Sequence, residues 1–294
     1  MALTCCGSQE PPLPQDLPEP TRQLSVLSIG NSFSTDALAY VPYLMLDAAP
    51  EIDLTIGILM QSGGALETHV HKITNGLAYI YYEWKRENGY WTTHTLTAQE
   101  TLALQQWDIV VLQQVSQWSA DFTSCQRHLP ILLDWLRKQG HTGQIAWLRT
   151  PAYADGYYRL TNGQVTINGT PAQLTSDEMS QAIDQCAEQV MAAYPIDLLL
   201  PCGNAIQLAR HTTLGQTGNS GGLTADGYHL QDGIGRYTEA CVVAQTLLPP
   251  GKTLGDIRVL DSWRVPDPHS SVTNMSPEEQ ALARQCAAQA SLQP

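Results

Sequence analysis

The sequence predicts an α/β fold in which a five-stranded parallel sheet lies between two layers of helices. Three observations predict this three-layer α/β/α sandwich. Short apolar segments alternate with longer amphipathic ones from residue 23 onward, which is the pattern of parallel strands joined by helical crossovers. Residues 108–112 are nearly all apolar, as a strand buried on both faces must be. The chain of 294 residues is 43% hydrophobic, which is enough for one sizeable core.

Five strands and five helices are expected along the chain, and five parallel strands of this kind fit a flavodoxin-like sheet. The strands are expected at residues 24–29, 53–59, 108–112, 144–148 and 197–200, and the helices at residues 37–48, 125–139, 176–194, 233–248 and 277–290. Gly140 follows the second of these helices, at a position where glycine commonly ends a helix. Ser176 is the expected cap of the third helix, with Asp177 and Glu178 in the first turn.

Two stretches interrupt this alternation with the signals of small β-hairpins. Residues 77–97 carry aromatic side chains with a period of two on either side of Asn88-Gly89. Residues 157–175 contain two Asn-Gly pairs, at residues 162–163 and 168–169. Both hairpins are expected to lie on the loop side of the sheet or at its edge.

The composition divides the chain into three parts. Residues 1–22 are rich in proline and have neither strand nor helix periodicity, so they are expected to form an extended tether. Residues 23–250 are expected to form one domain that carries both hairpins. Residues 251–294 are irregular until Pro277 and are expected to pack on the same domain as a C-terminal extension.

The first residues contain a possible lipidation site. Leu3-Thr4-Cys5-Cys6 looks like the end of a bacterial lipoprotein signal, with either cysteine as the lipidated residue. We therefore expect an exported protein in the periplasm or outer membrane, attached to a membrane only through lipid at this end. The basic and apolar regions of such a signal are missing from these residues, so a cytoplasmic location is the alternative. No long apolar window predicts a transmembrane helix.

Charge and cysteine content exclude several classes of function. The net charge is −13, with 15 Lys and Arg against 28 Asp and Glu, so no nucleic-acid partner is expected. None of the seven cysteines forms a C-x-x-C pair, which argues against a zinc ribbon or a thioredoxin-like site. His69 and His71 form an isolated H-x-H pair that is too little for a metal site. We therefore expect neither a metal nor a cofactor.

Candidate site residues follow the predicted strands. In an open parallel sheet, ligands bind beyond the carboxyl ends of the strands, where the following loops meet. Ser32 follows the first strand, Gly64 the second, and Gln113 with Gln114 the third, while Asp226-x-x-His229 precedes the helix at 233–248. A hydroxyl, an imidazole and an acid are the groups that serine-dependent acyl transfer requires.

Each of these groups has an expected role. Asp226 and His229 are three residues apart, so on one helical turn their side chains face the same way, with Asp226 orienting His229 as the base for Ser32. The N–H groups of Ser32 and Gly64 and the side-chain amide of Gln113 are the expected oxyanion donors. We favour Gln113 over Gln114 for this role.

Simpler interpretations of the same residues remain open. Ser32 is also suited to capping the first helix, and His229 to an ordinary structural role. Gly64 also fits a plain turn, and both glutamines also fit solvated loops. Ser220 lies in a G-x-S-x-G sequence, but the loop-like residues on both sides lack the strand and helix that this motif needs.

The ordered blocks resemble a known family. Gly30-Asn31-Ser32 looks like the G-D-S block of the SGNH (GDSL-type) hydrolases, Gly64 matches their glycine block, and Asp226-x-x-His229 matches their D-x-x-H block. Residues 112–116 and 201–205 are similar to the DUF4886 type found in gut Bacteroidetes. The resemblance covers residues 24–248 and implies a flavodoxin-like fold and ester hydrolysis, often deacetylation of carbohydrates.

Two departures from the SGNH pattern concern the site itself. Asn31 stands where the family has Asp, and no G-x-N-D block follows the third strand, so a glutamine must replace the family's asparagine. Residues expected to contact substrate are Asn31 and Gln114, with the loop aromatics Trp118, Tyr153, Tyr158 and Tyr228 available to stack on sugar rings.

Three functions are consistent with these observations. The first is a serine esterase that removes an acyl group, with acetyl expected first, or cleaves a methyl ester, on a small-molecule or glycan ester. The second is a glycan-binding lipoprotein of the same fold that is weakly active or inactive, because the G-x-N-D block is missing. The third is a flavin or phosphate binder, because residues 30–35 also resemble a hydroxyl-rich phosphate loop. The third leaves Asp226 and His229 without a role and is ranked last.

Overall fold

The structure is a computed structural model that describes residues 17–157, 164–257, 265 and 274–292. A seven-stranded sheet has the order β4-β3-β2-β1-β5-β6-β9. Five of its strands are parallel, as predicted: β1 (Arg22–Gly30), β2 (Ile52–Met60), β5 (Ile109–Leu112), β6 (Gln144–Leu148) and β9 (Leu198–Leu200). Their order, second-first-third-fourth-fifth, is that of a flavodoxin-like sheet.

The first predicted hairpin is part of the main sheet. Strands β3 (Ala78–Lys85) and β4 (Trp91–Thr97) continue the sheet antiparallel beyond β2, which gives seven strands where five were predicted. Alternate aromatic side chains of β3 enter the two cores, with Tyr79 and Tyr81 on one face and Tyr82 and Trp84 on the other. The period of two in the sequence therefore reflects burial on both faces of an edge hairpin.

The second predicted hairpin forms a separate two-stranded sheet from β7 (Gln164–Ile167) and β8 (Thr170–Gln173). Asn168 and Gly169 between them have φ angles of 49° and 80°, the left-handed pair that a tight two-residue hairpin turn needs. The other Asn-Gly pair, at residues 162–163, lies outside the described residues.

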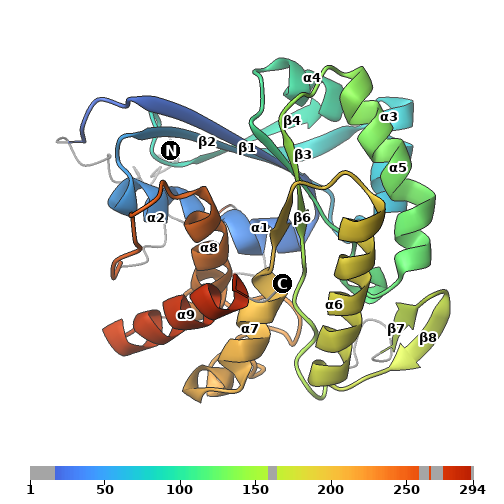
Figure 1. Ribbon diagram of the computed structural model, residues 1–294, viewed down its shortest axis with the longest axis vertical. Helices are drawn as coiled ribbons and strands as arrows, with labels where there is room; N and C mark the ends of the chain where they lie inside the picture. Colours follow the sequence, from blue (N-terminus) through green and yellow to red (C-terminus); the bar gives the residue numbers. More distant parts are fainter. Residues whose placement is uncertain (1–16, 158–163, 258–264, 266–273, 293–294) are drawn as a thin grey trace, which may run out of the picture.

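Helices cover both faces of the sheet (Figure 1). One face carries α1 (Ser32–Leu38), α2 (Val41–Ala48), α7 (Cys202–Arg210), α8 (Ile234–Leu247) and α9 (Pro277–Ala290), whose apolar side chains share one core with Val26, Ile56 and Val111. The other face carries α3 (Leu66–Asn75), α4 (Ala98–Ala103), α5 (Phe122–Lys138) and α6 (Ser176–Ala193), which pack around Leu27 and Val110. The three-layer prediction is thus confirmed.

Several helix details differ from the prediction. The expected helix at 37–48 is two helices, because Pro42 at the start of α2 has no N–H and cannot continue a preceding helix. The cap of α6 is Thr175, whose hydroxyl accepts from the N–H of Glu178 while the Glu178 carboxylate accepts from the N–H of Thr175. This complete capping box replaces the expected cap at Ser176. Helices α3, α4 and α7 were not predicted.

The C-terminal helix is built into the first core. Small side chains of α9, Ala283, Ala287 and Ala290, are fully buried against α7 and α8. Across the described ranges, none of the helices combines the length and apolar character needed to span a bilayer. Cys5 and Cys6, on which the lipoprotein prediction depends, lie outside the described residues.

Candidate active site

Ser32 is the first residue of α1 and directly follows the turn at the carboxyl end of β1. Asn31 caps this helix, because its Oδ1 accepts a hydrogen bond from the N–H of Phe33 at 3.0 Å. As the first helical residue, Ser32 has an N–H with no carbonyl partner inside the helix. The cap and the nucleophile candidate are therefore different residues, so Ser32 is not needed for capping.

His229 lies beside Ser32 although 197 residues separate them in the chain. Its Nε2 is 2.9 Å from Ser32 Oγ, and its Nδ1 is 2.7 Å from Asp226 Oδ2. His229 is only 3% exposed, so its ring orientation is fixed by these two contacts and by the side chains around it. The structure thus brings together the hydroxyl, imidazole and carboxylate that the sequence singled out.

Asp226 and His229 are held by a tight loop, and not by the helical turn expected from their spacing. Thr224 and Leu230 pair as an isolated antiparallel bridge that closes the loop. Gly227 has a φ of 101°, which reverses the chain between the acid and the imidazole. Asp226 Oδ1 accepts from the N–H of Tyr228 at 3.1 Å and from the N–H of His229 at 2.8 Å. One carboxylate oxygen is thereby left for His229 Nδ1.

The electrostatics keep Asp226 ionised. Partial burial works to raise its pKa, but the hydrogen bond and charge interaction with His229 and the two backbone N–H donors outweigh burial, so the pKa of Asp226 is lowered. An ionised Asp226 at Nδ1 places the imidazole proton on that nitrogen and leaves Nε2 free to accept the Ser32 proton.

The glycine loop, residues 61–64 after β2, differs from the expectation in one respect. The N–H of Gly64 donates to Gln61 O at 2.8 Å and closes a turn, so this group is not available to an oxyanion. Gly63 occupies the third position of that turn with a φ of 60°, which favours glycine, and it lines the pocket at Ser32. The expectation that the Gly64 N–H binds an oxyanion is therefore contradicted, because a sequence does not show which amide closes a turn.

The prediction that Gln113 is an oxyanion donor is also wrong. Gln113 is 1% exposed, its Nε2 donates to Asn31 Oδ1 at 2.6 Å, and its Oε1 accepts from Ser34 Oγ at 2.7 Å. Gln114 is equally buried, and its Oε1 accepts hydrogen bonds from the N–H groups of Leu66 and Val115. Neither glutamine is among the described residues that line the pocket, so substrate contact by Gln114 is not supported either.

A pocket of about 370 Å³ opens at Ser32. It is lined by Asn31, Ser32, Phe33, Ser62, Gly63, Val115, Ser116, Gln117, Tyr228 and His229. Ser116 and Gln117 come from a 3₁₀ helix, η1 (Ser116–Trp118), and were not predicted as site residues. The signal that could have found them is their place in the same loop as the two glutamines, only a few residues further on.

The aromatic candidates have different positions. Tyr228 lines the pocket and its ring lies over His229, with ring centroids 3.8 Å apart. Tyr153 is buried behind it, where its hydroxyl is 3.0 Å from Ser116 Oγ, and it does not line the pocket in the described part of the chain. Trp118 is likewise not part of the lining. Tyr158 lies outside the described residues.

Two other sequence motifs are placed away from this chemistry. Ser220 lies in a loop, as its flanking residues indicated, and its Oγ donates to Ala225 O. His69 is buried in α3 and stacks on Tyr79, while His71 is exposed and contacts Asn75. Within the described ranges, no three His, Cys, Asp or Glu side chains are grouped to hold a metal ion.

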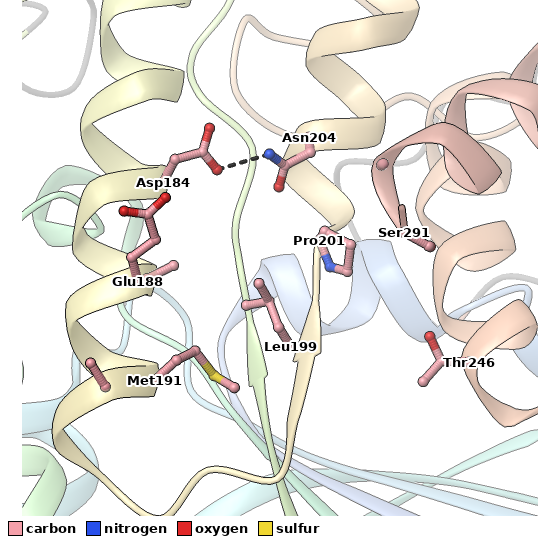
Figure 2. A pocket seen from close by; sticks show the side chains of 11 residues that line it. Asp184, Glu188, Met191, Leu199, Pro201, Asn204, Thr246 and Ser291 are labelled. Atoms are coloured by element: carbon pink, nitrogen blue, oxygen red, sulfur yellow. Dashed lines mark hydrogen bonds between the residues drawn. The ribbon is translucent and has the colours of Figure 1, made fainter. Parts of the chain in front are cut away.

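A larger pocket of about 890 Å³ lies beside the edge strand β9, between α6 and the end of α9 (Figure 2). It shares no lining residue with the pocket at Ser32. Its Asp184 is bound to Asn204 at 2.8 Å and paired with the buried Arg149. Among the described residues that line it there is no histidine, so this pocket is not the candidate for acyl transfer.

Comparisons with known proteins place the chain in a family. A family model described as "Domain of unknown function (DUF4886)" matches residues 25–252. The crystal structure of a DUF4886 family protein from Bacteroides uniformis ATCC 8492 is 29% identical, with a TM-score of 0.73, and the match covers 92% of this chain and 95% of that chain. A putative GDSL-like lipase from Parabacteroides merdae ATCC 43184 is 12% identical, with a TM-score of 0.48, over 79% of this chain and 99% of that chain. A search of curated proteins found no match. Since the family model spans most of its length, the chain belongs to the DUF4886 family.

Proposed function

We propose that this protein is a serine-dependent esterase that forms an acyl-enzyme on Ser32. One observation carries the proposal: Asp226, His229 and Ser32 form a continuous hydrogen-bonded line, with separations of 2.7 Å and 2.9 Å. The 2.9 Å distance lets His229 accept the proton of Ser32, and the 2.7 Å distance lets Asp226 orient His229. The order of the blocks along a flavodoxin-like sheet agrees with the resemblance to the SGNH hydrolases.

The reaction proceeds in two halves. Ser32 Oγ attacks the ester carbonyl carbon as its proton passes to His229 Nε2, and Asp226 stabilises the imidazolium that forms. Collapse of the tetrahedral intermediate breaks the bond to the alcohol, which takes the proton from His229 and leaves. Water then attacks the acyl-enzyme, with His229 again as base, and releases the carboxylic acid and Ser32.

The tetrahedral oxyanion needs donors that face the pocket. We assign this role to the N–H of Ser32 and the N–H of Gly63, because Ser32 starts α1 and Gly63 lines the same pocket. Asn31 and Gln117 are the lining residues with a side-chain amide, and because the Asn31 amide donates to Gly64 O, we propose Gln117 as a further donor to the substrate. Gly64 and Gln113 have no part in this assignment.

The lining of the pocket favours, as substrate, an ester of a small acyl group with a hydroxyl-rich alcohol. Its lining combines polar groups, Ser62, Ser116 and Gln117, with the ring of Tyr228. Serine hydroxyls and amides suit hydroxylated substrates, and an aromatic ring in the lining suits the apolar side of a sugar ring. We therefore propose an acetyl or similarly short ester, or a methyl ester, of a carbohydrate as the substrate. Export and lipid attachment through Cys5 or Cys6 are proposed with it.

The second candidate is a glycan-binding protein without turnover. The observation in its favour is that both glutamines after β5 are buried in structural hydrogen bonds, so the side-chain oxyanion donor that the SGNH pattern supplies at this loop is displaced. If Gln117 does not replace that donor, the transition state is less stabilised and kcat is lower by about 10²-fold or more.

The test is turnover of a chromogenic acetate by wild type, Ser32→Ala and Ser220→Ala. Ser220→Ala is the matched control, because Ser220 carries the competing G-x-S-x-G motif in an exposed loop. We expect wild type and the Ser220 variant to hydrolyse the ester and to be labelled by a fluorophosphonate, and the Ser32 variant to do neither. Glycan binding by a wild type that resists labelling would support the second candidate.

A further inference from the structure

Four buried side chains form a hydrogen-bonded series that runs from Ser28, near the carboxyl end of β1, to the glycine loop. Ser28 Oγ donates to Ser34 Oγ at 2.8 Å, and Ser34 Oγ donates to Gln113 Oε1 at 2.7 Å. Gln113 Nε2 donates to Asn31 Oδ1 at 2.6 Å, and Asn31 Nδ2 donates to Gly64 O at 3.0 Å. All four side chains are between 0% and 1% exposed. In each of these hydrogen bonds the acceptor is the next group along the series toward Gly64, so each bond has a defined donor and acceptor.

The amide of Asn31 cannot be reversed. Its Oδ1 faces the backbone N–H of Phe33, which is a donor only, and its Nδ2 faces the carbonyl of Gly64, which is an acceptor only. A flipped amide would place donor against donor and acceptor against acceptor in a dry site. The orientation of Asn31 then requires a donor at Gln113, so Gln113 turns its Nε2 to Asn31 and its Oε1 to Ser34, whose hydroxyl must donate.

We propose that Asn31 and Gln113 are positioning residues that fix the glycine loop at a set distance from the Ser32 turn. The inference rests on the proposed esterase function and extends it to residues that do not touch the reacting atoms. Asn31 binds both the start of α1, through Phe33, and the glycine loop, through Gly64. It therefore connects the two segments whose N–H groups, at Ser32 and Gly63, would bind the oxyanion.

This arrangement accounts for two features of the sequence. An aspartate at position 31 could still accept from Phe33 and Gln113, but its second oxygen would face the Gly64 carbonyl with no proton to donate. Only the neutral amide satisfies all three neighbours. A Cβ at position 30 would overlap Ser34 Oγ and contact Gln113. Glycine is therefore required at the end of β1, where these two side chains meet.

Three variants separate bridging from helix capping. Asn31→Ser keeps a good helix cap but is too short to reach Gly64, and Asn31→Asp keeps the cap and the Gln113 contact but loses the donor. Gln113→Glu places a carboxylate oxygen against Asn31 Oδ1 and disturbs the same bridge from its other end. Asn75→Ser is the matched control, since Asn75 is an exposed asparagine at the end of α3.

The kinetic readout is hydrolysis of a chromogenic acetate. We expect kcat to fall by about 10-fold to 100-fold in the Asn31 variants while KM changes by less than about threefold, because a displaced donor loses its effect mainly in the transition state. Asn75→Ser should match wild type. Wild-type kcat in Asn31→Ser would show that Asn31 only caps the helix and would overturn the proposal.

A second readout does not depend on activity. Hydrogen–deuterium exchange of the backbone at residues 61–66 should be faster in Asn31→Ser, Asn31→Asp and Gln113→Glu than in wild type and Asn75→Ser, because the loop has lost its anchor. Unchanged exchange in all three variants overturns the bridging role. Faster exchange in the three variants, together with a wild type that has no esterase turnover, would refute the proposed function and leave the anchoring of the loop established.

Discussion

Asp226→Asn is the substitution that tests the proposed mechanism most directly. Asp226 Oδ1 accepts from two backbone N–H groups, those of Tyr228 and His229. The oxygen of an asparagine must keep this place, because a flipped amide would set its NH₂ group against two donors. The NH₂ group then faces His229 Nδ1, which must become an acceptor. The imidazole proton moves to Nε2, and His229 loses its ability to accept the Ser32 proton.

The magnitude follows from this enforced tautomer. Loss of the base through the wrong tautomer costs about 10³-fold to 10⁴-fold in kcat, which corresponds to about 4–5.5 kcal/mol at 1.36 kcal/mol for each factor of ten. The Asp226 side chain is 35% exposed, so solvent weakens its interaction with His229. We therefore expect the lower end of the range, a loss of about 10³-fold.

The assay is initial-rate hydrolysis of a chromogenic acetate, with thermal melting to verify folding. Asp177→Asn is the matched control, because Asp177 Oδ1 lies 2.8 Å from His211 Nε2 in an exposed Asp–His pair elsewhere on the surface. This control should keep wild-type kcat. A folded Asp226→Asn protein that keeps more than about a tenth of wild-type kcat would refute the role of Asp226 and with it the assignment of His229 as base.

Three further substitutions test the buried polar groups. Gly30→Ala should lower the free energy of unfolding by about 1–3 kcal/mol in denaturant melts, because the new Cβ overlaps Ser34 Oγ; an unchanged midpoint would contradict this packing. Burial and nearby negative charge hold the pKa of Glu239 well above its usual range, so the folded state keeps a proton that the unfolded state loses above about pH 4.5. Wild-type stability should therefore fall with rising pH by about 1.4 kcal/mol per pH unit relative to Glu239→Gln, and parallel pH profiles would show an ionised Glu239. Burial, assisted by a nearby lysine, lowers the pKa of His69 to about 4, so wild type should lose about 3 kcal/mol relative to His69→Asn as pH falls from 6.5 to 4. Asparagine keeps an acceptor for the Tyr79 hydroxyl without titrating, and equal acid profiles would refute this account of His69.

The parallel core of the fold could be read from the sequence because its signals are local. A strand buried on both faces is mostly apolar, and β5 shows this pattern at every position, while β1 and β2 are short apolar segments with a few polar residues between helical stretches. The sequence left the β3–β4 hairpin either on the loop side of the sheet or at its edge, and the pairing of β3 with β2, which no local pattern encodes, decided for the edge. The break between α1 and α2 could have been predicted from Pro42, whereas α7 lacks both a side-chain cap and a clear start signal.

The site was predictable in its residue types and less so in its contacts. Ser32, Asp226 and His229 were identified because each lies in or directly after a loop that the topology brings to one edge of the sheet. Two of the three expected oxyanion donors, Gly64 and Gln113, already have partners within the protein, because hydrogen bonding across the fold decides which donors are available. Gly64 closes a turn and Gln113 holds Asn31, and both partners become visible only when the chain is folded.

The sequence by itself determined the alternation of strands and helices, the turn glycines and the chemical groups available after each strand, because these depend on near neighbours along the chain. Tertiary structure alone decided which groups meet, since Ser32 and His229 are 197 residues apart and their 2.9 Å contact arises only from the packing of the whole domain. It also decided which buried amides are hydrogen-bonded within the protein. A donor that is bonded in this way cannot bind a substrate.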